Sequence, residues 1–456
     1  MPVRQEPQER GRDTARDDVA GEVVARLADP RTLAAAIDVS ARQTTFTDFV
    51  RWRPHTVAGG YAGTAVLFGA ADARWPGQGW DEVGHRHLEQ AVAAMPSTPR
   101  VDTSLFSGLA GIGFAAQVLA AGRDRYRRLL TTVDGELCPR VTEAVAVVRG
   151  DAAGPVSVFD LISGLTGVGV YLLARRHAGS GSAATEALEA LLAGLGQLLA
   201  DDGDLPRWHT PVPFLSPAMR SAYPHGNLNC GLAHGLPGPV ALLALAILDG
   251  VEVDGVADGL AAAARWLADA RVERADGPDW PNAVGLPPED GPRRGSASVP
   301  PRDTAVAPPG AGRAGRAAWC YGSPGVARSL WLAGEALDDA ALRDLAVRAM
   351  CAVVARPPDA RLLTTPSFCH GTAGLLRLVD AFARDTSLPE LVTASESLVA
   401  ELAAAYDPTS VLGYRDVEAS GMAVDQPTLL DGAAGVALAL LGTCGAAPWE
   451  RLFLLS

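Results

Sequence analysis

Lysine is absent from this 456-residue sequence, and all 39 of its basic residues are arginine. Enzymes that form a Schiff base with their substrate, or that anchor pyridoxal phosphate, use a lysine amine for the covalent bond. The phosphate-binding P-loop also contains a lysine. The composition therefore excludes these three kinds of site.

Cysteines and long apolar runs are also scarce. Six cysteines are too few for a disulfide framework in a cytosolic chain of this length. The longest apolar run, PVALLALAIL, is far shorter than the roughly 20 residues of a membrane-spanning helix. The N-terminal segment, MPVRQEPQERGRDTARDDVAG, is polar and lacks the apolar core of a signal peptide. We therefore expect a soluble, cytoplasmic protein with no membrane span.

The sequence has no excess of positive charge. Its net charge of -13 argues against binding to nucleic acid or to an anionic membrane, because both need a basic face. The length of 456 residues suits one large domain or two to three ordinary ones, and the 48% of hydrophobic residues can form a sizeable core.

One short motif, G-x-x-G followed by about ten Ala-, Leu- and Val-rich residues, occurs seven times. A single G-x-x-G carries no information, but seven copies with the same apolar continuation indicate a repeat architecture. The first glycines of the seven pairs are Gly60, Gly108, Gly164, Gly235, Gly322, Gly371 and Gly432.

Each copy predicts a turn followed by a helix that is apolar on all sides and therefore buried. Amphipathic stretches between the copies, such as 184–200, 340–355 and 389–405, predict an outer layer of helices. The predicted fold is all-α, an α/α toroid in which seven helical hairpins form an inner and an outer ring. Closure of the ring removes the exposed ends of an open solenoid. It would also gather the seven turns at one end of the barrel.

Two segments depart from the repeat pattern. Residues 1–18 are polar, and we expect a disordered tail there. Residues 275–316 are rich in Pro and Gly and predict a flexible excursion on the mouth of the barrel. Residues 19–456 are expected to form a single toroid domain that includes this excursion.

Cysteine precedes two of the seven turns, in WCYGSPG (319–325) and FCHGTAG (368–374). A lone cysteine in a tight turn is usually a small buried residue, but here Cys320 and Cys369 stand at equivalent positions and His370 follows the second. Two thiolates and one imidazole are suitable ligands for Zn²⁺, and three protein ligands leave a fourth position open, as in catalytic sites.

The segments AHGLPG, RAAWCYGSPG and CHGTAG, in this order within seven G-x-x-G repeats, resemble the lanthionine synthetase C-like family. The resemblance covers essentially 55–445, and it implies an α/α toroid with Cys320, Cys369 and His370 as ligands of Zn²⁺. It also implies an enzyme of lanthipeptide (lantibiotic) biosynthesis. Such a cyclase adds peptide Cys thiols to dehydroalanine or dehydrobutyrine and so forms (methyl)lanthionine thioether rings.

The resemblance extends to residues around the expected metal. His234 matches a catalytic His and is a plausible general acid or base. Asp160 matches a functional Asp, although an Asp four residues before a turn glycine is often a plain helix N-cap. Arg316 and Tyr321 match positions near the zinc, where they would stabilise an enolate or hold the peptide backbone.

Three further residues are weaker candidates. Cys230 and His234 are four residues apart, a spacing that can bind a metal on one helix face, but both precede the helix. His225 would line the mouth or lie in a surface loop. Asp431 stands directly before Gly432, where capping of the next helix is the expected role.

The hypothesis is a stand-alone zinc-dependent cyclase. The 59 residues before Gly60 leave no room for a fused dehydratase, so a separate dehydratase would supply the dehydrated precursor peptide, and an exporter is a further candidate partner.

A non-catalytic relative that binds zinc and glutathione is the first alternative, against which His234, Asp160 and Arg316 argue. The second is another α/α toroid enzyme, such as a glycoside hydrolase, which needs paired carboxylates, or a zinc-dependent prenyltransferase, which places Asp, Cys and His on the metal.

Overall fold

The computed structural model describes residues 7–46, 50–97, 101–150, 152–179, 181–200, 205–288, 315–442 and 448–456. The chain divides into two compact units. Unit 1 comprises Met1–Val101, Ala115–Tyr126 and Leu363–Trp449, and unit 2 comprises Asp102–Phe114, Arg127–Leu362 and Glu450–Ser456.

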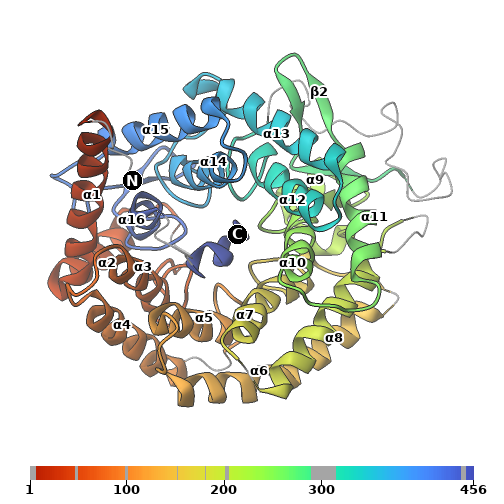
Figure 1. The fold of residues 1–456 in the computed structure, drawn as a ribbon, viewed down its shortest axis with the longest axis horizontal. Helices are drawn as coiled ribbons and strands as arrows, with labels where there is room; N and C mark the ends of the chain where they lie inside the picture. The colour runs from red at the N-terminus through yellow and green to blue at the C-terminus, as the bar shows by residue number, and fades with distance from the viewer. Residues whose placement is uncertain are drawn as a thin grey trace, which may run out of the picture. The chain divides into compact units, whose positions relative to one another are not determined.

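Unit 1 contains a layer of apolar helices, each of which follows a repeat turn. Helix α16 contacts both α3 and α14, while α4 covers α3, α15 covers α14 and α1 covers α16 (Figure 1). Helix α5 contributes only its second part to this unit. The helices and strands are α1 (Pro7–Ala28), α2 (Pro30–Gln43), α3 (Tyr61–Arg74), α4 (Trp80–Ala94), α5 (Leu109–Ala120), α14 (Thr372–Thr386), α15 (Pro389–Ala404), α16 (Ala433–Leu441), β5 (Asp416–Val417) and β6 (Ala423–Val424).

Unit 2 repeats this two-layer plan. Helix α10 contacts α7 and α12, and α8, α11 and α13 pack along their outer side, with α6 against α8 (Figure 1). Its helices and strands are α6 (Arg127–Arg149), α7 (Leu165–His177), α8 (Ser182–Leu199), α9 (Pro217–Ala222), β1 (Asn227–Asn229), α10 (Pro237–Leu248), α11 (Val256–Asp269), β2 (Val272–Arg274), β3 (Gly277–Asp279), β4 (Ala283–Gly285), α12 (Ser323–Ala336) and α13 (Ala340–Ala355).

The two layers follow from the composition of the helices. Helix α10, PGPVALLALAIL, is buried from Pro237 through Ala246, because a helix without a polar face must be covered all round. Helix α11 instead buries one face that includes Leu260, Ala263 and Leu267. The three amphipathic stretches predicted from the sequence are helices α8, α13 and α15.

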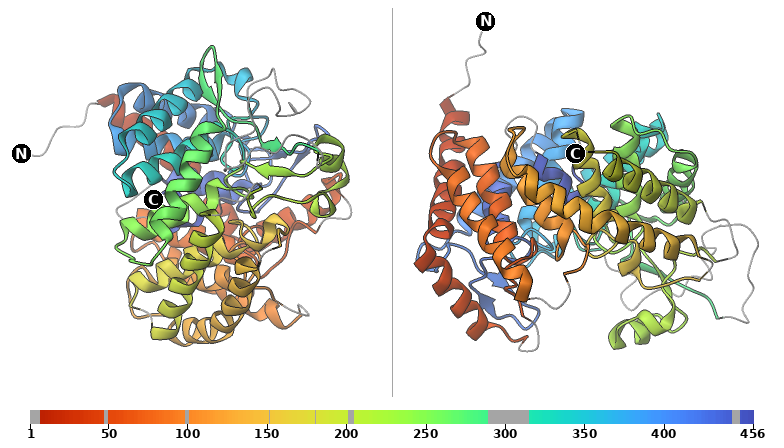
Figure 2. Two further views of the ribbon diagram at one scale, coloured as in Figure 1. Left: turned by 90° about the vertical axis from the view of Figure 1, so that its right-hand side faces the viewer. Right: turned by 90° about the horizontal axis from the view of Figure 1, so that it is seen from below.

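Short 3₁₀ turns and three two-stranded antiparallel sheets complete the described chain. The sheets pair β1 with β4, β2 with β3, and β5 with β6. In unit 1 the β5–β6 hairpin lies beside the end of α2 (Figure 2), where Asp425 N donates to Gln43 Oε1 at 2.9 Å. The 3₁₀ turns are η1 (Met95–Ser97), η2 (Val156–Val158), η3 (Val212–Phe214), η4 (Pro358–Arg361) and η5 (Pro448–Phe453).

Both segments that the sequence analysis set apart from the repeats are partly ordered. Helix α1 begins at Pro7, so the disordered tail expected over 1–18 is wrong from this residue on, because the Arg, Glu, Gln and Ala residues of this segment favour a helix. The flexible excursion expected over 275–316 is wrong for 275–288, which holds β3 and β4 and buries Trp280. Residues 289–314 lie outside the described part of the chain.

Backbone hydrogen bonds join neighbouring repeat turns. In each turn the bonded residue lies two positions before the first glycine of the G-x-x-G motif. In unit 2 Ala233 N donates to Cys320 O at 3.3 Å, and in unit 1 Cys369 N donates to Leu430 O at 2.8 Å. Leu430 N continues the pattern to Ala58 O at 3.2 Å. Adjacent turns are therefore held in register. The residues that directly precede the glycines of these turns are His234 and Tyr321 in unit 2, and His370, Asp431 and Gly59 in unit 1.

The turn that carries Cys320 is anchored by the residue before it. Trp319 is fully buried, its Nε1 donates to Phe453 O at 3.0 Å, and the two rings meet edge to face at 5.3 Å. Gly322 ends the same turn with φ +105°, and an added Cβ would approach Arg316 O to 1.6 Å. Only glycine fits there. The backbone on both sides of Cys320 is thus fixed by packing.

Candidate functional site

In unit 2 the structure brings together His234 and Asp160. The Nδ1 atom of His234 lies 2.6 Å from Asp160 Oδ2, while the other oxygen, Oδ1, accepts from Ser163 N at 2.7 Å and from Gly164 N at 2.9 Å. Asp160 is buried and His234 is 40% exposed. Because an ionised carboxylate only accepts, Nδ1 carries the proton, and Nε2 is left to exchange a proton with a substrate.

The N-cap of α7 is Gly164, with no side-chain cap, so Asp160 is not the helix N-cap that the sequence analysis considered, and its functional role stays a prediction. One oxygen caps the turn before α7, and the other orients an imidazole from the next turn.

Tyr321 stands beside this pair. Its ring centroid is 6.4 Å from that of His234, and its Oη accepts from Asn229 Nδ2 at 3.0 Å. Burial raises the pKa of Tyr321 to about 12, although the bond from Asn229 opposes the shift. The phenol is therefore protonated at neutral pH. Because Asn229 already donates to its oxygen, the phenolic hydrogen remains available for donation.

Cys320 and Arg316 flank the same turn in different surroundings. Cys320 is buried, and its carbonyl accepts from Ala233, the residue before His234. Arg316 is exposed, and among the described residues its guanidinium has no hydrogen-bond or ion-pair partner. The backbone carbonyl of Arg316 thus lies against Gly322. Within the described ranges, its side chain makes no hydrogen bond or ion pair with His234 or Asp160.

In unit 1 a second group forms at the turns before α14 and α16. One ligand atom each from Cys369, His370 and Asp431 lies within 4.8 Å of the others. The hydrogen bond from Cys369 N to Leu430 O brings these turns together. A soft thiolate, an imidazole and a carboxylate at these separations match the donor types that bind zinc, so the residues present fit a metal ion.

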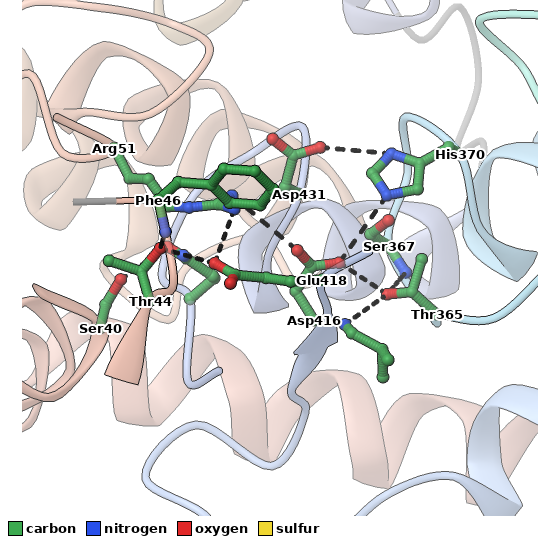
Figure 3. A network of polar contacts seen from close by, with 12 residues as sticks. Ser40, Thr44, Phe46, Arg51, Thr365, Ser367, His370, Asp416, Glu418 and Asp431 are labelled. Atoms are coloured by element: carbon green, nitrogen blue, oxygen red, sulfur yellow. Dashed lines mark hydrogen bonds and ion pairs between the residues drawn. The ribbon is translucent and has the colours of Figure 1, made fainter. Parts of the chain in front are cut away.

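The imidazole of His370 lies between two carboxylates (Figure 3). Its Nδ1 is 3.6 Å from Asp431 Oδ1, and its Nε2 is 4.0 Å from Asp416 Oδ1. Burial raises the pKa of both aspartates, and in Asp416 the neighbouring charge of Asp431 adds to the effect. Thr365 Oγ1 donates to Asp416 Oδ1 at 2.8 Å, which stabilises the ionised form.

A polar network behind Asp416 connects the hairpin to the end of α2 (Figure 3). Arg51 Nη2 donates to Glu418 Oε1 at 2.8 Å, and its Nη1 is 3.9 Å from Asp416 Oδ2. Burial opposes ionisation of Glu418, but hydrogen bonds from Thr44 and Thr45 and the charge of Arg51 hold its pKa below the ordinary value. The network fixes Asp416 in place.

The sequence analysis did not include Asp416, and it assigned Asp431 to helix capping. The N-cap of α16 is Gly432, and no side chain caps it, so the capping role is wrong. One signal in the sequence pointed to Asp431, because it occupies the same place before the glycine as His234, Tyr321 and His370. Asp416 lies outside any repeat motif and has no such signal.

The remaining candidates have ordinary surroundings. Cys230 is buried, its Sγ is 3.6 Å from Leu228 O, and burial raises the pKa of its thiol to about 12. Such a thiol is neutral and unsuited to metal binding. His225 is exposed in a turn.

The sequence and the fold of this chain are similar to those of known proteins. The family model of the lanthionine synthetase C-like proteins matches residues 51–454, and the chain belongs to this family. The nisin biosynthesis protein NisC of Lactococcus lactis subsp. lactis is 24% identical over 327 residues, which are 69% of this chain and 72% of that protein.

Among solved structures, a nisin cyclase matches with a TM-score of 0.70 at 20% identity, covering 94% of this chain and 98% of that one. This similarity confirms the predicted all-α fold class, the α/α toroid. Within the described ranges, no helix combines the length and apolar character that a membrane crossing requires.

Proposed function

We propose that this protein is a zinc-dependent lanthipeptide cyclase, which adds peptide Cys thiols to dehydroalanine or dehydrobutyrine and forms (methyl)lanthionine rings. The observation that carries the proposal is the donor group of Cys369, His370 and Asp431, whose ligand atoms lie within 4.8 Å of one another and are suited to zinc. The chain's membership of the lanthionine synthetase C-like family and its similarity to a nisin cyclase support it.

The proposed zinc ligands are Cys320, Cys369 and His370. Cys320 belongs to unit 2 and the other two to unit 1, so this set rests on the paired WCYG and CHG motifs. When bound, zinc would supply a Lewis acid that lowers the pKa of a substrate thiol from its usual value of about 8.5.

The proposed proton chemistry belongs to His234. Attack of a thiolate on Cβ of the dehydro residue leaves an enolate that must be protonated at Cα. The buried Asp160 holds Nδ1 of His234, so the half-exposed ring presents Nε2 as the atom that gives or takes the proton. The protonated hydroxyl of Tyr321 is a donor for the enolate oxygen, and the exposed guanidinium of Arg316 is suited to hold the peptide.

We further propose that residues 19–456 act as one cyclase domain. The family match over 51–454 runs through both compact units, which supports this. The substrate would be a precursor peptide dehydrated by a separate enzyme in the cytoplasm, and an exporter would act on the product.

The test is a cyclisation assay. The zinc-loaded protein is incubated with its cognate dehydrated peptide, and the thiols that remain are alkylated and counted by mass spectrometry. After incubation with the wild type, the peptide thiols should no longer be alkylated. After incubation with His234→Ala, they should still be alkylated.

Full labelling after incubation with the zinc-loaded wild type would count against a cyclase. If that protein still bound zinc and glutathione, the result would favour the non-catalytic alternative.

A further inference from the structure

Asp431 belongs to the donor group of unit 1 although it lies outside the WCYG and CHG motifs. It directly precedes Gly432 and helix α16, as His370 directly precedes Gly371 and helix α14. The Cys369 N to Leu430 O hydrogen bond ties the two turns together one residue away from Asp431. The repeat register therefore sets the backbone position of Asp431 beside the turn that carries His370.

The distance between Asp431 and His370 indicates a shared ligand. Their Oδ1 and Nδ1 atoms are 3.6 Å apart, longer than a hydrogen bond of about 2.7–3.2 Å. Two ligands of one tetrahedral zinc, each bound at about 2.0–2.1 Å, would be roughly 3.3 Å apart. The Sγ atom of Cys369 lies within 4.8 Å of both, so one ion can reach all three.

The carboxylate of Asp431 also lacks the local role that other turn aspartates have. Asp102 Oδ1 accepts from Ser104 N at 2.9 Å, and Asp160 caps its own turn. With the residues that the structure describes, Asp431 accepts no hydrogen bond, and it is about one-third exposed. Its oxygens are thus free to bind a ligand in the space beside His370.

The opposite face of the imidazole is occupied by a different carboxylate. Asp416 lies on the Nε2 side at 4.0 Å and is held by Thr365 and Arg51. The separation of 4.0 Å is longer than a hydrogen bond, whereas the carboxylate of Asp431 is nearer to the ring, 3.6 Å from Nδ1. The metal position is therefore on the Nδ1 side, shared with Asp431.

We infer that Asp431 Oδ1 is a metal ligand together with Cys369 Sγ and His370 Nδ1, and that it occupies the coordination position a substrate thiol takes. This inference rests on the metal site of the proposed function. On thiol binding the metal–oxygen bond is replaced by a metal–sulfur bond, and the thiol proton passes to the buffer. The exchange is favourable because zinc accepts soft thiolates readily.

The experiment measures metal and thiol binding without any peptide. Zinc affinity is determined by competition with a chromophoric chelator, and thiol binding by titrating 2-mercaptoethanol into the Co²⁺-loaded protein and following the sulfur-to-metal charge-transfer band. Asp431→Asn should raise the zinc dissociation constant by on the order of tenfold to a hundredfold. It should also bind the thiol more tightly, because no carboxylate competes.

Two further variants separate ligation from folding. Asp38→Asn removes an exposed carboxylate on α2 of the same unit and should match the wild type in both titrations. Asp431→His supplies another ligand and should restore most of the zinc affinity with an altered Co²⁺ spectrum.

Zinc and thiol affinities of Asp431→Asn equal to those of the wild type would overturn the assignment. A wild type that binds no zinc would overturn the proposed function with it. Normal metal titrations in a protein that does not cyclise peptide would refute only the cyclase.

Discussion

At the scale of single residues, the position before the first glycine of a turn holds most of the residues to which we assign chemistry in the proposed function. His234 and Tyr321 occupy it in unit 2, and His370 and Asp431 in unit 1. Each side chain leaves its backbone at the N-terminal end of a buried helix, where packing fixes the backbone and not the side chain. Each repeat thus provides the same fixed backbone position, and the residue type at that position differs from one turn to the next.

Asp160→Asn tests the pairing with His234. The Asn oxygen can still accept from Ser163 and Gly164, but its NH₂ group would face Nδ1 and force the imidazole proton onto Nε2. We expect the cyclisation rate to fall by on the order of 10²–10⁴ while zinc content stays unchanged. Rates come from single-turnover mass spectrometry and zinc from elemental analysis.

Asp102→Asn is the matched control, because Asp102 caps its turn through Ser104 and no His lies on its other oxygen among the described contacts. It should keep the wild-type rate. Equal losses in the two variants would contradict an orienting role for Asp160.

At the scale of elements, the contact between α3 and α4 contains a buried titratable group. His87 on α4 lies with Nδ1 2.7 Å from Thr64 Oγ1 on α3, and its ring meets Phe68 edge to face at 4.8 Å. Thr64 donates its own hydrogen to Tyr61 O, so His87 is the donor in this pair. Burial lowers the pKa of His87 to about 4, and the neutral imidazole is the form that fits.

Stability should therefore depend on pH through His87. Its pKa is about 6.5 in the unfolded chain, so the unfolded state takes up a proton first as pH falls. The contribution of the neutral His87 to the free energy of unfolding is present above about pH 6.5 and is lost as pH falls towards 4. Between pH 7 and 5 this amounts to roughly 2 kcal/mol of unfolding free energy.

Urea unfolding at the two pH values measures the effect. Between pH 7 and 5, the free energy of unfolding of His87→Gln should fall by about 2 kcal/mol less than that of the wild type. His85→Gln, which changes an exposed ring on the same helix, should retain the full dependence. The same loss in both variants would show that other groups cause it.

At the scale of the whole molecule, the proposed metal site draws on residues remote in the sequence. Cys320 and Cys369 are 49 positions apart, and they fall in the two different compact units. The proposal of this ligand set therefore rests on two separate repeat motifs, in contrast to the local ligand spacing of a zinc finger.

Metal content tests this set. The purified wild type should carry about one zinc ion per chain, and Cys320→Ala should lose zinc on dialysis together with cyclisation. Cys351→Ala, which changes a partly exposed cysteine on α13, should keep both. Full zinc occupancy in Cys320→Ala would remove Cys320 from the ligand set.

The repeat architecture was predictable because the same sequence pattern, a glycine pair followed by an apolar run, occurs in every copy. The seven glycine pairs and the apolar runs after them determined the buried helices, and charge on one face determined α8, α13 and α15. The short strands were not predictable in the same way. The pairing of β1 with β4 depends on a partner more than fifty residues away, and two or three residues carry no periodic signal.

For the candidate site, the sequence determined which residue types stand at the turns: Cys369 and His370, His234, and Asp160 four residues before a glycine. Tertiary structure alone decided that Asp160 reaches His234, that Asn229 holds Tyr321, and that Asp431 and Asp416 lie on opposite sides of His370. Helices and turns form through contacts between neighbours along the chain, whereas these contacts join residues 46 to 92 positions apart. Such distances are fixed only when the helices that carry the turns have packed.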